Sequence, residues 1–125
     1  LEKAFGLNLC EYSTGKTRRD KQLEQRGLHI SKRGPKHPRF LLFFLAMRQI
    51  NSRTTAFCPV ARAWYDARLA RNGNNKMKAL VALMRKLTSA LWWVARGATY
   101  DPEKLYNVEN LKRQGFLQDY ISNAA

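Results

Sequence analysis

The sequence predicts an all-α fold, a small helical domain of three main helices with a long basic N-terminal loop. Apolar residues recur at helical spacing between residues 75 and 97. Helix boundaries are also marked, because Pro38 suits a first helical turn and Asn72-Gly73 is a left-handed stop signal. The 125 residues fit one domain, and the 45% that are apolar can build its core.

The N-terminal third of the chain is expected to be mostly loop. Residues 1–12 are predicted to form a short helix or strand that leads into a turn, with Gly6 as a break. Residues 13–38 combine many charges with five glycines and prolines, which is typical of a loop that is ordered only where it is pinned. These residues are Gly15, Gly27, Gly34, Pro35 and Pro38.

Two helices are predicted next. The first should begin after Pro38 and run to about Asn51. Its apolar residues cover most of the circumference, so we expect it to be the central buried helix. Those residues are Leu41, Phe44, Leu45 and Met47. The second should run from about Thr55 to Arg71, with Pro59 in its first turn or at a kink.

The third helix has the clearest signals, because Asn75 can cap it and Gly97 can end it. Its expected core positions are Leu80, Met84, Leu87, Leu91 and Val94. After a turn at 100–102, residues 103–107 are predicted to add a helical turn. The domain is thus expected to span residues 1–107, with a mobile or loosely packed tail over residues 108–125.

The net charge of +14 belongs to the predicted folded part of the chain. Residues 16–39 carry +7 and residues 40–98 carry +9, whereas each flanking segment carries −1. The aliphatic and aromatic residues between Phe40 and Val94 distinguish this region from a disordered basic arm. A basic folded surface favours a polyanion, so we expect nucleic acid as the partner before an acidic membrane surface or an acidic protein.

The cysteines and the short apolar stretches favour a cytoplasmic protein without a membrane span. Cys10 and Cys58 show no pairing pattern, which fits a reducing cytoplasm. A zinc site that joins them to His29 and His37 is conceivable, but the gaps match no compact ligand spacing, and no metal site is predicted. The apolar stretch 40–47 is far shorter than the ~20 residues of a membrane span. No signal peptide is recognised. The opening Leu1 favours a fragment of a longer protein.

Gly15-Lys16-Thr17 looks like the end of a phosphate-binding P-loop. The complete motif needs a glycine where Cys10 stands, and it needs a preceding strand of a parallel sheet. A helical chain does not offer that strand. We therefore reject a nucleoside triphosphatase.

Three features admit both a functional and a plain interpretation. Ser13 is either a turn residue bonded to the backbone or a nucleophile on a glycine-containing loop, which would need an activating base or metal. The cations of residues 31–39 either form a solvated loop or contact a phosphate backbone, which would relieve their mutual repulsion. The tryptophans can stack on bases, but at helical spacing they are more often packing or interface residues. They are Trp64, Trp92 and Trp93.

Taken in order, several segments resemble the C-terminal, serine-containing domain of the transposase family of insertion sequences 110, 116 and 902. The similarity runs from residue 1 to about residue 107, and each piece is weak but the order and spacing are specific. The matching segments are Gly6-Leu7-Asn8, Tyr12-Ser13-Thr14-Gly15-Lys16, Ile30-Ser31-Lys32-Arg33-Gly34-Pro35, 42–50, Ala63-Trp64-Tyr65, 78–87 and Ala95-Arg96-Gly97.

The resemblance implies a part of an enzyme that cuts and rejoins DNA through a covalent serine–phosphate link, guided by a structured bridge RNA. Ser13 would be the nucleophile, and Thr14 stands at the second position of the family's Ser-Ser-Gly-like motif. A divalent metal such as Mg is expected in a separate N-terminal domain with four acidic residues, and no cofactor is expected in this segment. The loop between Gly15 and Ile30 is a few residues longer than is usual in the family.

Together, the basic residues and the resemblance predict a nucleic-acid contact set and a set of partners. The candidate contacts are Lys16, Arg18, Arg19, Lys32, Arg33, Lys36, Arg39, Lys78 and Arg85. The expected partners are DNA, a structured guide RNA and further copies of the full-length protein, in the cytoplasm of a bacterium or archaeon and associated with the nucleoid. The alternatives are a non-catalytic nucleic-acid-binding module, a decayed transposase remnant, or a structural module that oligomerises through Trp64 and Trp93.

Overall fold

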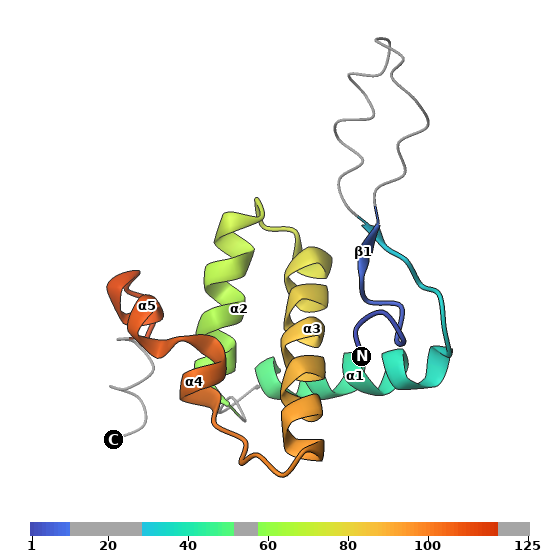
Figure 1. Cartoon of the computed structure of the whole chain (residues 1–125). Coiled ribbons are helices and arrows are strands. Elements are labelled where there is room, and N and C mark those ends of the chain that lie inside the picture. Colours follow the sequence, from blue (N-terminus) through green and yellow to red (C-terminus); the bar gives the residue numbers. More distant parts are fainter. Residues whose placement is uncertain (11–28, 52–57, 118–125) are drawn as a thin grey trace, which may run out of the picture.

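The computed structural model describes residues 1–10, 29–51 and 58–117, and it confirms a mostly helical domain in which three main helices pack together (Figure 1). The main helices are α1 (Lys36–Ile50), α2 (Pro59–Arg71) and α3 (Lys76–Ala95). Two short helices, α4 (Pro102–Tyr106) and α5 (Val108–Arg113), follow. Two-residue strands β1 (Leu9–Cys10) and β2 (His29–Ile30) pair antiparallel.

Helix α3 forms the centre of the domain. Its N-cap is Asn75, whose side chain accepts a hydrogen bond from the backbone N–H of Lys78 at 3.1 Å, as the sequence predicts. One face of α3 is buried from Ala79 to Ala90 and packs against both α1 and α2. The buried residues are Ala79, Leu80, Leu83, Met84, Leu87, Thr88 and Ala90. The prediction of Leu91 and Val94 as core residues was wrong, since both are exposed where α3 extends past its neighbours (Figure 1).

Helix α1 corrects the prediction of a central buried helix. It begins at Lys36, so Pro38 lies within its first turn, where a missing backbone N–H costs no hydrogen bond. The buried residues of α1 are Leu42, Ala46, Gln49 and Ile50, and Phe43, Leu45 and Met47 pack against the core while partly exposed. The opposite side leaves Leu41 67% and Phe44 54% exposed. The all-round apolar pattern misled the prediction because α1 crosses α3 on one side of the domain (Figure 1).

Helix α2 starts at Pro59, which occupies the first helical position and so causes no kink. The predicted extension to Thr55 falls outside the described residues. The fully buried Ala61 and Ala63 present no bulky side chain to the rest of the core. The helix ends at Arg71 as predicted, and Gly73 follows with a φ of +60°.

The chain beyond α3 packs more closely than the sequence suggests. Asp101 caps α4 by accepting from the backbone N–H of Glu103 at 3.0 Å, close to the predicted helical turn. The expected loose tail was wrong for residues 108–117, because they form α5 and bury Leu111 and Leu117. Only these two widely spaced leucines are fully buried there, which explains the weak sequence pattern. The division of the chain at residue 107 stays a prediction.

The N-terminal segment is fastened to the turn before α1. Leu7 is fully buried, and the backbone N–H of Lys32 donates to the Gly6 carbonyl at 3.0 Å. Gly6 has a φ of +69°, and a Cβ there would lie 2.8 Å from the Arg33 nitrogen and closer still to the Arg33 carbonyl oxygen. The predicted break at Gly6 is therefore also a place of close backbone approach.

This close approach gives a stability prediction. Gly6→Ala should destabilise the fold by about 2–4 kcal/mol, from left-handed strain plus backbone overlap. Gly73→Ala is the matched control, because Gly73 has a similar φ of +60° but no heavy atom within 4 Å of an added Cβ. It should cost only about 1 kcal/mol. Urea unfolding of both variants measures the difference, and equal losses would contradict the close approach at Gly6.

Candidate nucleic-acid interface

The turn that carries Lys32 and Arg33 is held in place by backbone contacts, while both side chains are exposed. Lys32 adopts a φ of +54°, and Gly34 a φ of +108°. A Cβ at Gly34 would overlap the carbonyl oxygen of Ala4, so the turn lies directly on the N-terminal segment. Two adjacent cations on a pinned, exposed turn suit contact with a phosphate backbone.

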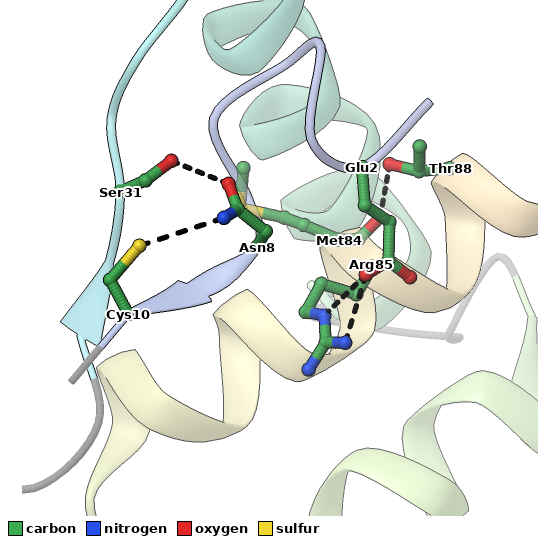
Figure 2. A network of polar contacts seen from close by, with 7 residues as sticks. All are labelled: Glu2, Asn8, Cys10, Ser31, Met84, Arg85 and Thr88. Carbon is green, nitrogen blue, oxygen red and sulfur yellow. Dashed lines mark hydrogen bonds and ion pairs between the residues drawn. The ribbon is translucent and has the colours of Figure 1, made fainter.

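A short chain of polar contacts fixes the base of this turn (Figure 2). The Ser31 hydroxyl donates to Asn8 Oδ1 at 2.5 Å, and Asn8 Nδ2 donates to Cys10 Sγ at 3.5 Å. The backbone N–H of Ser31 also donates to the Asn8 carbonyl at 3.0 Å. These contacts connect the turn to strand β1, and the described chain stops at Cys10, shortly before Ser13.

Arg39 has a structural contact as well as a charge. Its Nη1 donates to the Phe5 carbonyl oxygen at 3.2 Å, and its side chain is half-buried beside Gly6. One of its five N–H donors therefore holds the N-terminal segment against α1. Arg39 is thus a clamp in addition to a candidate phosphate contact.

Arg85 is similarly engaged. Its Nη2 lies 2.8 Å and its Nε 2.9 Å from the Glu2 carboxylate, which ties α3 to the N-terminal segment (Figure 2). Both side chains are about one-third exposed, at 35% and 36%. A pair this exposed contributes at most ~1 kcal/mol, so a phosphate could compete with Glu2 for Arg85. The sequence does not foresee this pairing.

Lys36 and Lys78 are exposed cations in the first turns of α1 and α3. No acidic residue lies in the first turn of either helix. The N-terminus of a helix carries a partial positive charge, so a lysine there is unfavourable and an anion is favourable. Both lysines therefore fit the predicted contact with phosphate.

The remaining predicted site residues fall in segment 11–28, outside the described residues. They are Ser13, Lys16, Arg18 and Arg19. The backbones of Lys32 and Arg33 and the Arg39 guanidinium group approach Gly6. The predicted nucleophile Ser13 lies outside the described residues.

The tryptophans separate into two environments. Trp64 is half-buried, with its ring centroid 5.9 Å from that of Tyr106, which fits a packing role. Trp92 and Trp93 are 47% and 57% exposed at the end of α3. Trp93 lines a mostly apolar pocket of about 460 Å³ together with Tyr100. Burial raises the pKa of Tyr106, so its phenol stays protonated and uncharged.

Three further cations gather around Trp64, and the sequence interpretation did not select them. They are Arg68, Arg71 and Lys86. The signal was present, since Trp64, Arg68 and Arg71 are spaced to share one face of a helix. The higher charge density of the loop before α1 masks this weaker signal in the sequence.

Among residues 1–10, 29–51 and 58–117, no three His, Cys, Asp or Glu side chains come together as metal ligands. Cys10 and Cys58 are both half-buried free thiols. None of the described helices combines the length and apolar character that a bilayer span requires.

The fold and these contacts define a small basic all-α domain. Comparison of the chain with protein-family models, curated proteins and solved structures gave no match. The resemblance to the insertion-sequence transposases thus stays an expectation from the sequence.

The effect of Arg39 on stability can be measured separately from any role in nucleic-acid binding. Arg39→Ala should destabilise the domain by about 1 kcal/mol, because it leaves the Phe5 carbonyl without this donor. Lys36→Ala, an exposed cation on the same helix, should change stability by less than ~0.5 kcal/mol. Thermal unfolding without nucleic acid measures both, and equal stability of the two variants would assign Arg39 to binding alone.

Proposed function

We propose that this chain is a nucleic-acid-binding domain that serves, in a longer parent protein, as the serine-containing domain of an RNA-guided DNA transposase. The observation that supports binding most directly is the exposed, backbone-pinned pair Lys32–Arg33 within a region of +16 spanning residues 16–98. The transposase assignment rests on the resemblance of the ordered sequence segments. The site of action is the nucleoid-associated cytoplasm of a bacterium or archaeon.

In this role the cations position the strand and the serine acts on it. Lys32, Arg33 and Lys36 bind phosphate oxygens, which neutralises charge without reading sequence. The Ser13 hydroxyl oxygen attacks a DNA phosphorus, and a phosphorus–oxygen bond of the strand breaks. The leaving oxygen takes up a proton, and the serine proton passes to a base from another part of the parent. A divalent metal such as Mg, expected in a separate acidic domain, would support this activation.

Binding is tested by its dependence on salt. Five or more phosphate contacts give a slope of about −4 or steeper in log affinity against log salt on duplex DNA. Lys32→Ala combined with Arg33→Ala should weaken binding and make the slope shallower by about 1–2, with less than ~0.5 kcal/mol lost in stability. Fluorescence anisotropy at several salt concentrations measures this. Affinity that hardly changes with salt would refute the nucleic-acid assignment.

The catalytic part is tested in the reconstituted parent with guide RNA and labelled DNA. Ser13→Ala should abolish the covalent protein–DNA adduct and retain DNA binding, because the basic residues remain. Thr14→Ala is the neighbouring control and should have a milder effect. Mass spectrometry locates the adduct. An adduct that persists in Ser13→Ala, or that maps to Thr14 or Tyr12, would overturn the assignment of Ser13.

A second candidate is a helical module that associates with other copies, as also expected for the full-length parent. The observation that favours it is the exposed apolar end of α3, with Trp92, Trp93 and Val94. Trp64 does not belong to this surface, since it packs on Tyr106. Sedimentation separates the two candidates: association that persists at high salt without nucleic acid supports the module.

A further inference from the structure

A basic groove runs along α2 and α3 and reaches the α4–α5 segment. It consists of two recesses that share Trp64, Arg68 and Lys86. In Figure 1, α2 and α3 lie side by side and antiparallel, with α4 and α5 beside α2. The first recess, about 280 Å³, is closed by the α4–α5 segment and adds Arg71. The second, about 350 Å³, extends along α3 to Arg85 and Ser89.

The cations of the groove are held in position from different helices. The guanidinium carbon of Arg68 on α2 and the Nζ of Lys86 on α3 each lie 5.9 Å from the centroid of the Trp64 ring. Cation–π attraction therefore holds both charges over one aromatic ring. Lys86 Nζ also donates to the Leu105 carbonyl at 2.9 Å, which ties α3 to α4. This engages one of its three N–H donors.

The chemistry of the first recess selects for an anion. Arg68, Arg71 and Lys86 line it, with Asn107, Asn110 and Gln114 on the facing segment, and no carboxylate is among its described lining residues. Arg68 Nε is buried and has no hydrogen-bond partner among the described residues. A buried charged donor without an acceptor is costly. An oxyanion in the recess that Arg68 lines would compensate the charge of its guanidinium group. In the second recess, Glu2 is already paired with Arg85.

We infer that this groove binds the phosphodiester backbone of a single-stranded nucleic acid. A recess of about 280 Å³ is slightly below the ~300–1,000 Å³ of drug-sized ligand sites, which suits a phosphate and part of a nucleotide. A positively charged groove that follows the backbone is the usual way in which proteins bind single strands. Asn107, Asn110 and Gln114 line the same recess. Asn107 Oδ1 accepts from the backbone N–H of Asn110, and Asn110 Oδ1 accepts from Gln114 Nε2, so the side-chain N–H groups of Asn107 and Asn110 are the donors we assign to the edges of unpaired bases.

This inference rests on the proposed function for one point, that the bound phosphate belongs to a nucleic acid. The groove itself is separate from the Lys32–Arg33 turn. Of the described candidate contacts predicted from the sequence, only Arg85 lines the groove. Binding at the groove and binding at the turn can therefore be disproved independently of each other. A strand could occupy the groove while a duplex contacts the turn.

The test compares two exposed arginines in the last turns of their helices. Arg71 lines the groove, and Arg113, at the end of α5, lines neither recess. Arg71→Ala should weaken binding of short labelled oligo(dT) or oligo(rU) about tenfold and lower the salt slope by about 0.7, the value for one phosphate on a single strand. Arg113→Ala removes the same charge and should change affinity less than about twofold. Comparison of the two oligonucleotides identifies the source as DNA or RNA.

A second variant, at Arg68, and the NMR signal of the Trp64 side chain test the groove in two further ways. Arg68→Gln should also weaken binding about tenfold, and the indole N–H resonance of Trp64 should shift when oligonucleotide is added to the unaltered protein. If Arg68→Gln fails to fold, Arg71→Ala against Arg113→Ala decides the question.

Each pattern of results has one meaning. Equal losses in Arg71→Ala and Arg113→Ala, with loss also in the Lys32/Arg33 variant, would overturn the groove and leave the proposed function standing. No oligonucleotide binding by the unaltered protein would overturn both. A Trp64 shift with pyrophosphate but not with oligonucleotide would refute a nucleic acid as the ligand of the groove.

Discussion

Burial of one face of α3 is the constraint on which the rest of the structure depends. Leu83 is fully buried, and Leu80, Met84 and Leu87 are at most 5% exposed. Each fully buried side chain of this type contributes about 1.5–3 kcal/mol through removal from water. Helices α1 and α2 lie against this face, and α4 and α5 then pack on α2. The α3 cations Lys78, Arg85 and Lys86 lie outside this buried face.

The sequence predicts this centre well and the periphery less well, for identifiable reasons. Asn75, the leucine spacing and Gly97 all favour the same helix, so local propensity and packing agree. The apolar residues of α1 do not indicate which face of that helix is buried, because apolar side chains also lie on its exposed side. Phe40 and Phe44 pack edge to face there, with ring centroids 4.6 Å apart. Burial there depends on which side of α3 the helix crosses, and no residue of α1 encodes that alone. An apolar surface of this kind is unusual on an isolated domain and typical of an interaction site.

The candidate interface is likewise predicted in part from the sequence. Charge predicts which residues are available to a polyanion, and Lys32, Arg33, Lys36 and Lys78 are exposed as that prediction requires. Charge does not predict the partners within the fold. Arg39 and Arg85 acquire the Phe5 carbonyl and the Glu2 carboxylate only because the N-terminal segment folds back onto α1 and α3. Arg68 and Lys86 come together over Trp64 only after two helices and a third segment have packed.

The proposed nucleic-acid binding would be coupled to the folded state through these contacts. Residues 40–98 carry +9, and compaction brings these like charges close together, which opposes folding. A phosphate strand at Arg68, Arg71 and Lys86 would replace that repulsion with attraction, and it can do so only in the folded protein, where the three side chains converge. A ligand that binds only the folded state stabilises it by mass action. The same charges that lower the stability of the free domain would therefore favour the proposed bound state.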